Sequence, residues 1–270
     1  MASDIVRKRW SGKWALVTGA SAGIGDAIAV ELAKAGVNLI LTARRGDRLE
    51  LLAQRLRSEY GVQTQVIVAD LTLPETPQRI FDVTEGAGTP CDLVVNNAGF
   101  GEYGEFLRSD LERQLAMVQV NCGSVVHLTR LFLPRMISRG GGDVMIVSST
   151  AAYQPVPYLA TYAATKAFDR FLAEALAEEV KRYGVNVSAL CPGPTESEFN
   201  QVAGGGRPSQ NRKAQSAQEV ALRGLEGLAR GAHWVIPYAS GRLQIFAERF
   251  VPRKTVTGAV ERMFRPKGLK

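Results

Sequence analysis

The stretch from Trp14 to Gly25, WALVTGASAGIG, decides the fold of this chain. Its first five residues form an apolar run typical of a buried strand, and the glycines after it lead into a helical pattern that continues to about Lys34. Glycines at such a turn let the backbone approach a pyrophosphate closely, and the helix N-terminus attracts that anion. The alternative is a tight turn whose glycines serve packing alone. Because the stretch follows a strand and opens a helix, we predict a dinucleotide-binding turn.

Short β-rich runs alternate with longer helical segments along the rest of the chain. The further strands are expected at 37–42, 65–69, 92–95, 144–147, 185–190 and 233–236. Helices are expected at 47–60, 110–139, 159–182 and 218–230, and over much of the chain beyond 240. Repeated βα units with nearly continuous apolar strands indicate a parallel sheet covered on both faces. We therefore predict an α/β protein, a single-domain doubly wound Rossmann fold with a seven-stranded parallel sheet.

The composition of the 270 residues is that of a soluble globular protein, with 46% hydrophobic and 22% charged residues. No nucleic-acid-binding motif accompanies the net charge of +7, so we expect a solvated basic surface and no nucleic-acid partner. Cys91, Cys122 and Cys191 form no CxxC or Cys/His cluster, which indicates free thiols in a reducing compartment and no metal site. With neither a secretory signal nor an apolar stretch of about 20 residues, the chain is expected to be cytoplasmic.

Both ends of the predicted domain, which spans 1–270, differ from the repeated units. Residues 1–12 are expected to be an N-terminal tail, and residues 240–270 a C-terminal helical extension. The extension has an apolar stripe of Leu243, Phe246, Phe250 and Val251, and the basic residues around it are Arg242, Arg249, Arg253 and Lys254. Such a helix can lie on an anionic membrane. We favour packing onto the body or a neighbouring subunit, because an apolar stripe at helical spacing is usually core.

Several further motifs follow the glycine turn in a fixed order. They are Asn96-Asn97-Ala98-Gly99, Asn121, Ser149, Tyr162-x-x-x-Lys166 and Pro192-Gly193. Together with TGASAGIG, they resemble the short-chain dehydrogenases/reductases over residues 14 to about 200. The resemblance implies an oxidoreductase that transfers a hydride between a nicotinamide cofactor and a ketone or aldehyde carbonyl, of 3-oxoacyl, steroid-like or general type. It also implies a homodimer or homotetramer, and a substrate lid over residues 196–216.

The end of the second strand indicates which nicotinamide cofactor is used. Ala43 stands where relatives that use NAD usually carry an acid, and Arg44 follows, as in relatives that prefer NADP. A guanidinium binds a 2′-phosphate through charge-assisted hydrogen bonds, whereas a carboxylate repels it. We therefore predict NADP(H). The alternative is that Arg44 and Arg45 are solvated residues at a helix start.

The expected cofactor contacts come from the glycine turn and from the resemblance. Asp70 is expected at the adenine amino group, and Thr195 and Ser197 at the nicotinamide carboxamide or the phosphates. Asn97 is expected to line the adenosine side or to brace the sheet. The complete set is Gly19, Ser21, Gly23, Ile24, Gly25, Arg44, Arg45, Asp70, Leu71, Asn97, Ala98, Gly99, Tyr162, Lys166, Pro192, Gly193, Thr195 and Ser197.

The expected catalytic residues are Tyr162, Lys166, Ser149 and Asn121. A free tyrosine has a pKa near 10, and an ammonium nearby lowers it by stabilising the phenolate. Tyr162 and Lys166 are four residues apart on a predicted helix, so their side chains share one face. Tyr162 is then the general acid/base. Ser149 would stabilise the carbonyl oxygen, and strand alternation turns Ser148 to the opposite face. By resemblance, Asn121 interrupts its helix and holds a water that connects Lys166 to solvent.

Two other functions compete with carbonyl reduction. A nucleotide-sugar epimerase or dehydratase also uses a YxxxK pair, but the glycine spacing and the short C-terminal third argue against it. A non-catalytic NADP-binding sensor or scaffold is the alternative of another class, and loss of the tyrosine, lysine or serine would indicate it. The predicted lid has glycines at 204–206 and the basic residues Arg207, Arg212 and Lys213, which attract an anionic substrate or belong to a solvated loop.

Overall fold

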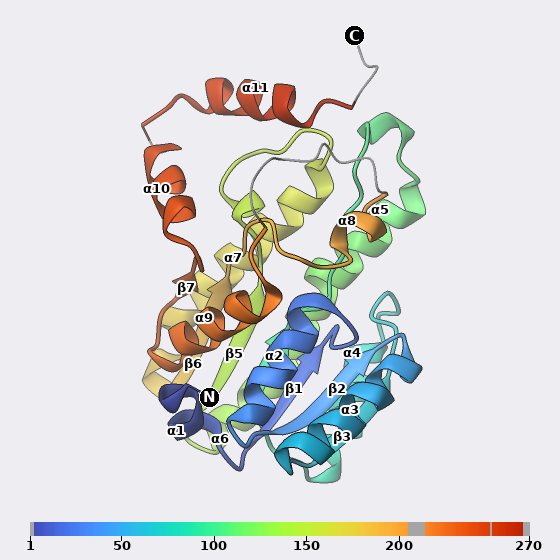
Figure 1. Ribbon diagram of the computed structural model, residues 1–270, viewed down its shortest axis with the longest axis vertical. Helices are drawn as coiled ribbons and strands as arrows, with labels where there is room; N and C mark the ends of the chain where they lie inside the picture. The colour runs from blue at the N-terminus through green and yellow to red at the C-terminus, as the bar shows by residue number, and fades with distance from the viewer. Residues whose placement is uncertain (1–2, 205–213, 249, 267–270) are drawn as a thin grey trace.

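Seven apolar runs form one parallel sheet in the order β3-β2-β1-β4-β5-β6-β7 (Figure 1). The structure is a computed structural model that describes residues 3–204, 214–248 and 250–266. The strands are β1 Trp14–Thr18, β2 Asn38–Ala43, β3 Thr64–Val68, β4 Cys91–Asn96, β5 Gly142–Val147, β6 Val185–Leu190 and β7 Trp234–Val235. The strand order reverses between β1 and β4, which is the point at which ligands bind in such sheets. The predicted doubly wound fold is confirmed.

Helices cover both faces of the sheet. One face is covered by α2 Gly23–Lys34, α3 Gly46–Tyr60 and α9 Ala217–Ala229. The other is covered by α4 Thr76–Asp82, α6 Ser124–Ser138 and α7 Ala160–Val180. The central strand β1 is therefore buried from both sides, and Ala15, Leu16 and Val17 are all inaccessible to solvent. This double burial explains why its side chains do not alternate between apolar and polar.

The register of the strands brings the functional segments to one edge of the sheet. Val17 pairs with Leu41 of β2 and with Val95 of β4, so these three strands end at the same level. The glycine turn, the arginines after β2 and the segment from Asn97 to Gly99 therefore meet at this carboxyl edge. The segments after β5 and β6 end there too, because β4, β5 and β6 pair in parallel.

Residues 3–12 do not form the tail that was predicted over 1–12. They contain helix α1, Asp4–Trp10, and the side chains of Val6 and Trp10 are buried. The Trp10 indole donates to Asp143 Oδ2 at 2.8 Å, and the Arg9 guanidinium donates to both oxygens of that carboxylate at 3.0 Å. The basic residues of the segment suggested a solvated surface, whereas one of them neutralises a buried carboxylate of β5.

The segment predicted as one helix over 110–139 has a break in the middle. Helix α5, Leu111–Val118, passes through a π-helical turn, Gln119–Gly123, into α6. The C-terminal extension contains α10, Ala239–Glu248, and α11, Arg253–Phe264, which crosses over the carboxyl edge of the sheet (Figure 1). Among the described helices, none is long and apolar enough to cross a membrane.

The predicted lid is described only at its two ends. Residues 196–204 include the short helix α8, Phe199–Val202, and Thr195 forms a parallel bridge with Gln215. Gly205, Gly206, Arg207, Arg212 and Lys213 lie outside the described residues.

Candidate active site

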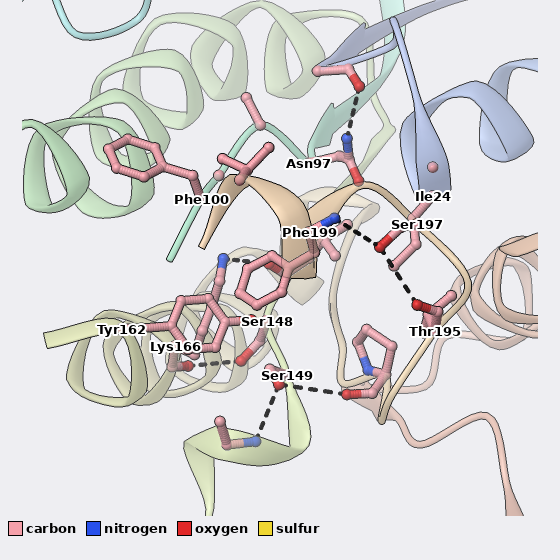
Figure 2. Close-up of a pocket in the computed structure, with 18 of the residues that line it drawn as sticks. Ile24, Asn97, Phe100, Ser148, Ser149, Tyr162, Lys166, Thr195, Ser197 and Phe199 are labelled. Carbon is pink, nitrogen blue, oxygen red and sulfur yellow. Dashed lines mark hydrogen bonds between the residues drawn. The ribbon is translucent and has the colours of Figure 1, made fainter. Parts of the chain in front are cut away.

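A cavity of about 460 Å³ lies at the carboxyl edge of the sheet (Figure 2). It is bounded by the turn after β1, by the segments that follow β2, β4, β5 and β6, and by residues of α7. It lies at the reversal of the strand order, where the fold leads us to expect a ligand. Nearly all of the predicted site residues line it; the exceptions are Gly25 and Asn121.

The glycine turn after β1 leaves room for an anion and no room for side chains. Gly19 and Gly23 have positive φ angles of +66° and +61°, and a Cβ at Gly19 would lie 2.8 Å from Asn97 Nδ2. Helix α2 begins at Gly23, and no side chain caps its N-terminus. Its first N–H groups are therefore available to a phosphate, and the turn fits a dinucleotide. Gly25 also has no room for a side chain, because a Cβ there would overlap the Gly19 carbonyl oxygen.

Asn97 braces this turn against β1. Its side-chain amide donates to the carbonyl oxygens of Thr18 at 2.8 Å and Gly19 at 3.3 Å. The Thr18 hydroxyl accepts from the backbone N–H groups of Asn97 and Ala98, both at 2.9 Å, and donates to Val95. Of the two roles expected for Asn97, the structure shows the bracing role, while its position on the cavity wall is compatible with the other.

The two arginines after β2 have different surroundings. The Arg45 guanidinium donates to the Ser21 hydroxyl at 3.1 Å and pairs with Glu198 at 2.7 Å, and Arg48 pairs with the same carboxylate at 2.6 Å. These hydrogen bonds, that of Arg48 first, hold the pKa of Glu198 below its ordinary value. Arg44 lines the cavity and pairs with no residue that the structure describes. Of these arginines, Arg44 is therefore the one with its charge available to a phosphate.

Tyr162 and Ser149 face the same part of the cavity (Figure 2). Tyr162 lies on the first turn of α7 and packs against Phe199, with ring centroids 5.0 Å apart. The Ser149 hydroxyl accepts from the Ala151 N–H at 3.1 Å and has a long contact of 3.5 Å to the Pro192 carbonyl. Ser148 is buried and donates to the Lys166 carbonyl at 2.6 Å, so it supports α7. The sequence distinguished these two serines correctly.

Lys166 is buried beside Tyr162 and makes an ion pair that was not predicted from the sequence. Its ammonium donates to the Val147 carbonyl and to Asp169 Oδ2, both at 2.9 Å. Burial lowers the pKa of Lys166, but Asp169 and then Tyr162 act in the opposite direction, and the net shift is upward. Burial raises the pKa of the Asp169 carboxyl to about 6, against the opposing effect of Lys166. Asp169 follows Lys166 by three residues on the same helix. An acidic residue on the buried face beside the lysine was therefore the signal in the sequence that could have predicted this ion pair.

Asn121 stands behind the cavity in the π-helical turn. Its amide donates to the Phe100 carbonyl at 3.0 Å and to the Thr165 hydroxyl at 2.9 Å, and its Oδ1 accepts from the Phe100 N–H at 3.1 Å. Both amide protons are therefore used within the protein. The side chain fixes the chain after β4 against α7, and the break in helical bonding expected at Asn121 is present.

One wall of the cavity is apolar and comes largely from segments outside the predicted motifs. Phe199 of α8 lies over Tyr162, and Val260, Met263 and Phe264 of α11 close the far side. Two hydrogen bonds hold α11 in place: Tyr103 donates to the Phe264 carbonyl and Tyr158 to Glu261, both at 2.7 Å. The cavity therefore accommodates an apolar group beside Tyr162. No sequence motif marks these residues, since the fold alone brings them to the site.

This fold and site define a nucleotide-dependent oxidoreductase. The sequence model of the family described as short chain dehydrogenase matches residues 13–206, and the chain belongs to that family.

Curated relatives and a solved structure agree with this assignment. The very-long-chain 3-oxoacyl-CoA reductase of Rattus norvegicus is 31% identical over 252 residues, which cover 92% of this chain and 79% of the relative. The reductase of the same name from Bos taurus is 38% identical over 189 residues, covering 68% and 59%. A short-chain dehydrogenase from Sphingobium yanoikuyae, solved in complex with NADPH, superposes with a TM-score of 0.80 at 29% identity, covering 91% of this chain and 95% of that chain.

Proposed function

We propose that this chain is an NADPH-dependent reductase of carbonyl compounds, with 3-oxoacyl thioesters as its substrates. The observation that carries the proposal is that Tyr162, Lys166 and Ser149 line the same cavity as the glycine turn and Arg44. A reducing cofactor held at the turn and a carbonyl held at Tyr162 would thus share one enclosed space.

The residues present fit NADP(H). The glycine turn and the uncapped N-terminus of α2 would hold the pyrophosphate, Arg44 the 2′-phosphate, and Asp70 and Leu71 the adenine side. Thr195 and Ser197 would hold the nicotinamide end. When bound, NADPH supplies the hydride that the carbonyl carbon accepts.

Arg44→Asp tests the cofactor assignment. The substitution replaces a free guanidinium with a carboxylate that repels the 2′-phosphate, and charge-assisted hydrogen bonds contribute about 1.5–3 kcal/mol each. We expect the parent to prefer NADPH, and the variant to raise the KM for NADPH at least ~10-fold while the KM for NADH changes little. Steady-state kinetics with both cofactors measures this. A parent without preference would contradict the assignment.

The catalytic groups would act on the carbonyl oxygen. Ser149 donates a hydrogen bond to it, which requires the hydroxyl to turn from its long contact with Pro192. Tyr162 then donates its proton to the oxygen. The positive charge of Lys166 stabilises the phenolate that remains. The third N–H of the Lys166 ammonium is left for the cofactor ribose, and Asn121, whose amide protons are already used, would hold through an oxygen the water that supplies a replacement proton.

The substrate class rests on the relatives and on the shape of the cavity. The two curated relatives are named as 3-oxoacyl-CoA reductases, and the cavity here has an apolar wall of Phe199, Val260, Met263 and Phe264 that suits an acyl chain. Steroid-like and simple carbonyl compounds are the competing substrates.

Oxidation of NADPH with a panel of carbonyl compounds tests the function. The panel contains long-chain 3-oxoacyl thioesters, diketones, steroids and simple aldehydes, and the loss of NADPH absorbance is measured. We expect the highest kcat/KM with the 3-oxoacyl thioesters. Tyr162→Phe should lose about 100-fold to 10,000-fold in kcat, the range for general acid catalysis, while still binding NADPH. Tight NADPH binding by the parent without turnover of any carbonyl would indicate a sensor or scaffold instead.

The segment 196–216 would act as a lid over the cofactor. The Arg45–Glu198 ion pair joins its first residues to the glycine turn, and a Cβ at Gly23 would lie 3.0 Å from Ser197 Cβ. These contacts support closure over a bound dinucleotide. We further propose a cytoplasmic location, since the three cysteines are free, and a homodimer or homotetramer.

A further inference from the structure

Large apolar side chains are exposed where α10 meets α11. Leu243 and Phe246 lie on α10, and Phe250 and Val251 on the connection, with exposed fractions of 70%, 56%, 76% and 41%. We call these four residues the C-terminal corner, which projects from the body of the molecule (Figure 1). The Phe246 and Phe250 rings pack edge to face, 5.4 Å between centroids. The body of this chain does not cover the stripe, so of the two covers expected from the sequence, the body and a neighbouring subunit, the first is wrong, and the corner needs a cover from outside the chain.

The charge of the same region is mostly positive. Residues 241–270 contain eight of the 33 basic residues and two of the 26 acidic residues, and so carry +6 of the net charge of +7. Arg253 and Lys254 directly follow the corner and are exposed. Arg249 lies outside the described residues. An apolar surface bordered by basic residues matches a partner that is apolar inside and anionic at its surface.

The charges of Arg253 and Lys254 do not stabilise helix α11. Arg253 and Lys254 occupy its first turn, which contains no acidic residue. Positive charge at a helix N-terminus opposes the helix dipole and destabilises the helix. An external phosphate would reverse this effect, since it would bind the two side chains and the positive end of the dipole together.

A second copy of this chain does not fit the corner. A twofold axis through this surface would place the basic segments of both copies against each other. Like charges at close range oppose association, and no acidic group lies in the first turn of α11 to compensate. An anionic lipid surface, by contrast, attracts basic residues and accepts apolar side chains below its headgroups.

We infer that the C-terminal corner binds the surface of an anionic lipid membrane. Phe250 and Val251 enter the boundary between headgroups and acyl chains, and Arg253 and Lys254 bind lipid phosphates. The other end of α11 contributes Val260, Met263 and Phe264 to the cavity, so the helix that binds the membrane also closes the cavity. Docking at this site gives an apolar substrate a short path from the lipid into the cavity. Lipid binding itself does not depend on which carbonyl is reduced.

Vesicle co-sedimentation of the full chain, without substrate or cofactor, tests the inference. The vesicles are phosphatidylcholine alone, or phosphatidylcholine with a one-third share of phosphatidylglycerol. We expect binding to the anionic vesicles only, and its loss at roughly 1 M salt, where the Debye length is about 3 Å. Two double variants should each lower the partition coefficient at least ~10-fold: Arg253→Glu/Lys254→Glu and Phe250→Ser/Val251→Ser. Turnover of a short soluble carbonyl compound should not change, because none of these residues lines the cavity.

Matched control variants lie at other places in the fold. Lys181→Glu/Arg182→Glu reverses two adjacent exposed charges in the turn Lys181–Tyr183 before β6, and Leu51→Ser removes an exposed leucine of α3. Both should bind like the parent. Equal binding to neutral vesicles, no binding to either vesicle, or unchanged binding by the corner variants would overturn the inference. Self-association of the parent that Phe250→Ser/Val251→Ser abolishes would place a second copy on the corner and overturn it as well.

Discussion

The ion pair between Lys166 and Asp169 determines whether a positive charge lies beside Tyr162. An ammonium buried as fully as Lys166 tends to lose its proton, because burial disfavours the charged form. Asp169, 2.9 Å away, opposes this loss. The second oxygen of Asp169 has no hydrogen-bond partner among the described atoms, so this carboxylate pays a desolvation cost for which no second contact compensates. We therefore expect that the role of Asp169 is to keep Lys166 protonated.

Asp169→Asn should therefore change the pH dependence of the reaction. The amide keeps the shape of the side chain but removes the negative charge. Burial, the largest influence on Lys166, then lowers its pKa unopposed by Asp169. A neutral Lys166 stabilises the Tyr162 phenolate less than a charged one does. We expect the low-pH limb of kcat/KM for alcohol oxidation, which requires the phenolate, to move up by about one unit or more, about 1.4 kcal/mol.

The sign of this shift distinguishes the possible roles of Asp169. If Lys166 kept its charge without Asp169, loss of the carboxylate would favour the phenolate and move the limb to lower pH. Such a result, or an unchanged profile, would contradict the prediction. Cys122 is the other titratable neighbour, and burial raises its pKa to about 12, so it stays protonated at neutral pH. Asp169→Glu retains the charge and should restore the parent profile, while circular dichroism and NADPH binding check that the variants fold.

At the residue scale, the spacing of residues predicts which side chains lie together when a single helix or strand carries all of them. Tyr162 and Lys166 share a face because they lie four residues apart on one helix, and Ser148 and Ser149 have different surroundings because they are consecutive in extended chain directly after β5. The pairing of Arg45 with Glu198 was not predictable in this way. It joins residues 153 positions apart, and the fold alone brings them together. Without it, Arg44 and Arg45 look equivalent in the sequence.

At the scale of the element, the bounds of a segment were predicted correctly where turn-forming residues mark both of its ends. Strand β6 has the predicted bounds, Val185–Leu190, because Gly184 with its φ of +74° precedes it and Pro192 follows closely. Helix α4 was missed because its seven residues include Pro77 and few apolar positions. It is stabilised by burial of Ile80 and by the edge-to-face contact of Phe81 with Phe132 of α6, which no local pattern reveals.

For the C-terminal helices, a local pattern was present but did not predict what the helices pack against. The apolar stripe has the spacing of a core-facing helix, and this periodicity was the reason for expecting it to pack on the body or on a neighbouring subunit. Periodicity shows only that one face of a helix is apolar. Whether protein, lipid or a second subunit covers that face depends on where the fold leaves the helix and on the charges around it. For α10 and the connection to α11, the body of this chain does not cover the stripe.

At the scale of the whole molecule, two groups of exposed apolar residues differ in the charges around them. One is the C-terminal corner, whose surroundings are basic. The other lies on α5 and α7 and on the start of α6, and its members are Leu111, Leu115, Val118, Val126, Phe168 and Phe171. Charges of both signs lie near it, including the Arg170–Glu174 ion pair on α7. Mixed charges allow a surface to complement itself across a twofold axis, so this helical surface suits a second copy of the chain.

Phe171→Glu tests whether this helical surface forms the expected oligomer. Phe171 is 63% exposed, and a carboxylate there would face an apolar partner and, across a twofold axis, its own copy. We expect the parent to have the mass of a dimer or tetramer in light scattering after gel filtration, and the variant to dissociate into smaller species. Leu51→Glu on α3 changes a similarly exposed position outside the surface and should assemble like the parent. A monomeric parent, or a Phe171→Glu variant that assembles normally, would rule this surface out, while lipid binding at the C-terminal corner would persist in either protein because the two surfaces share no residue.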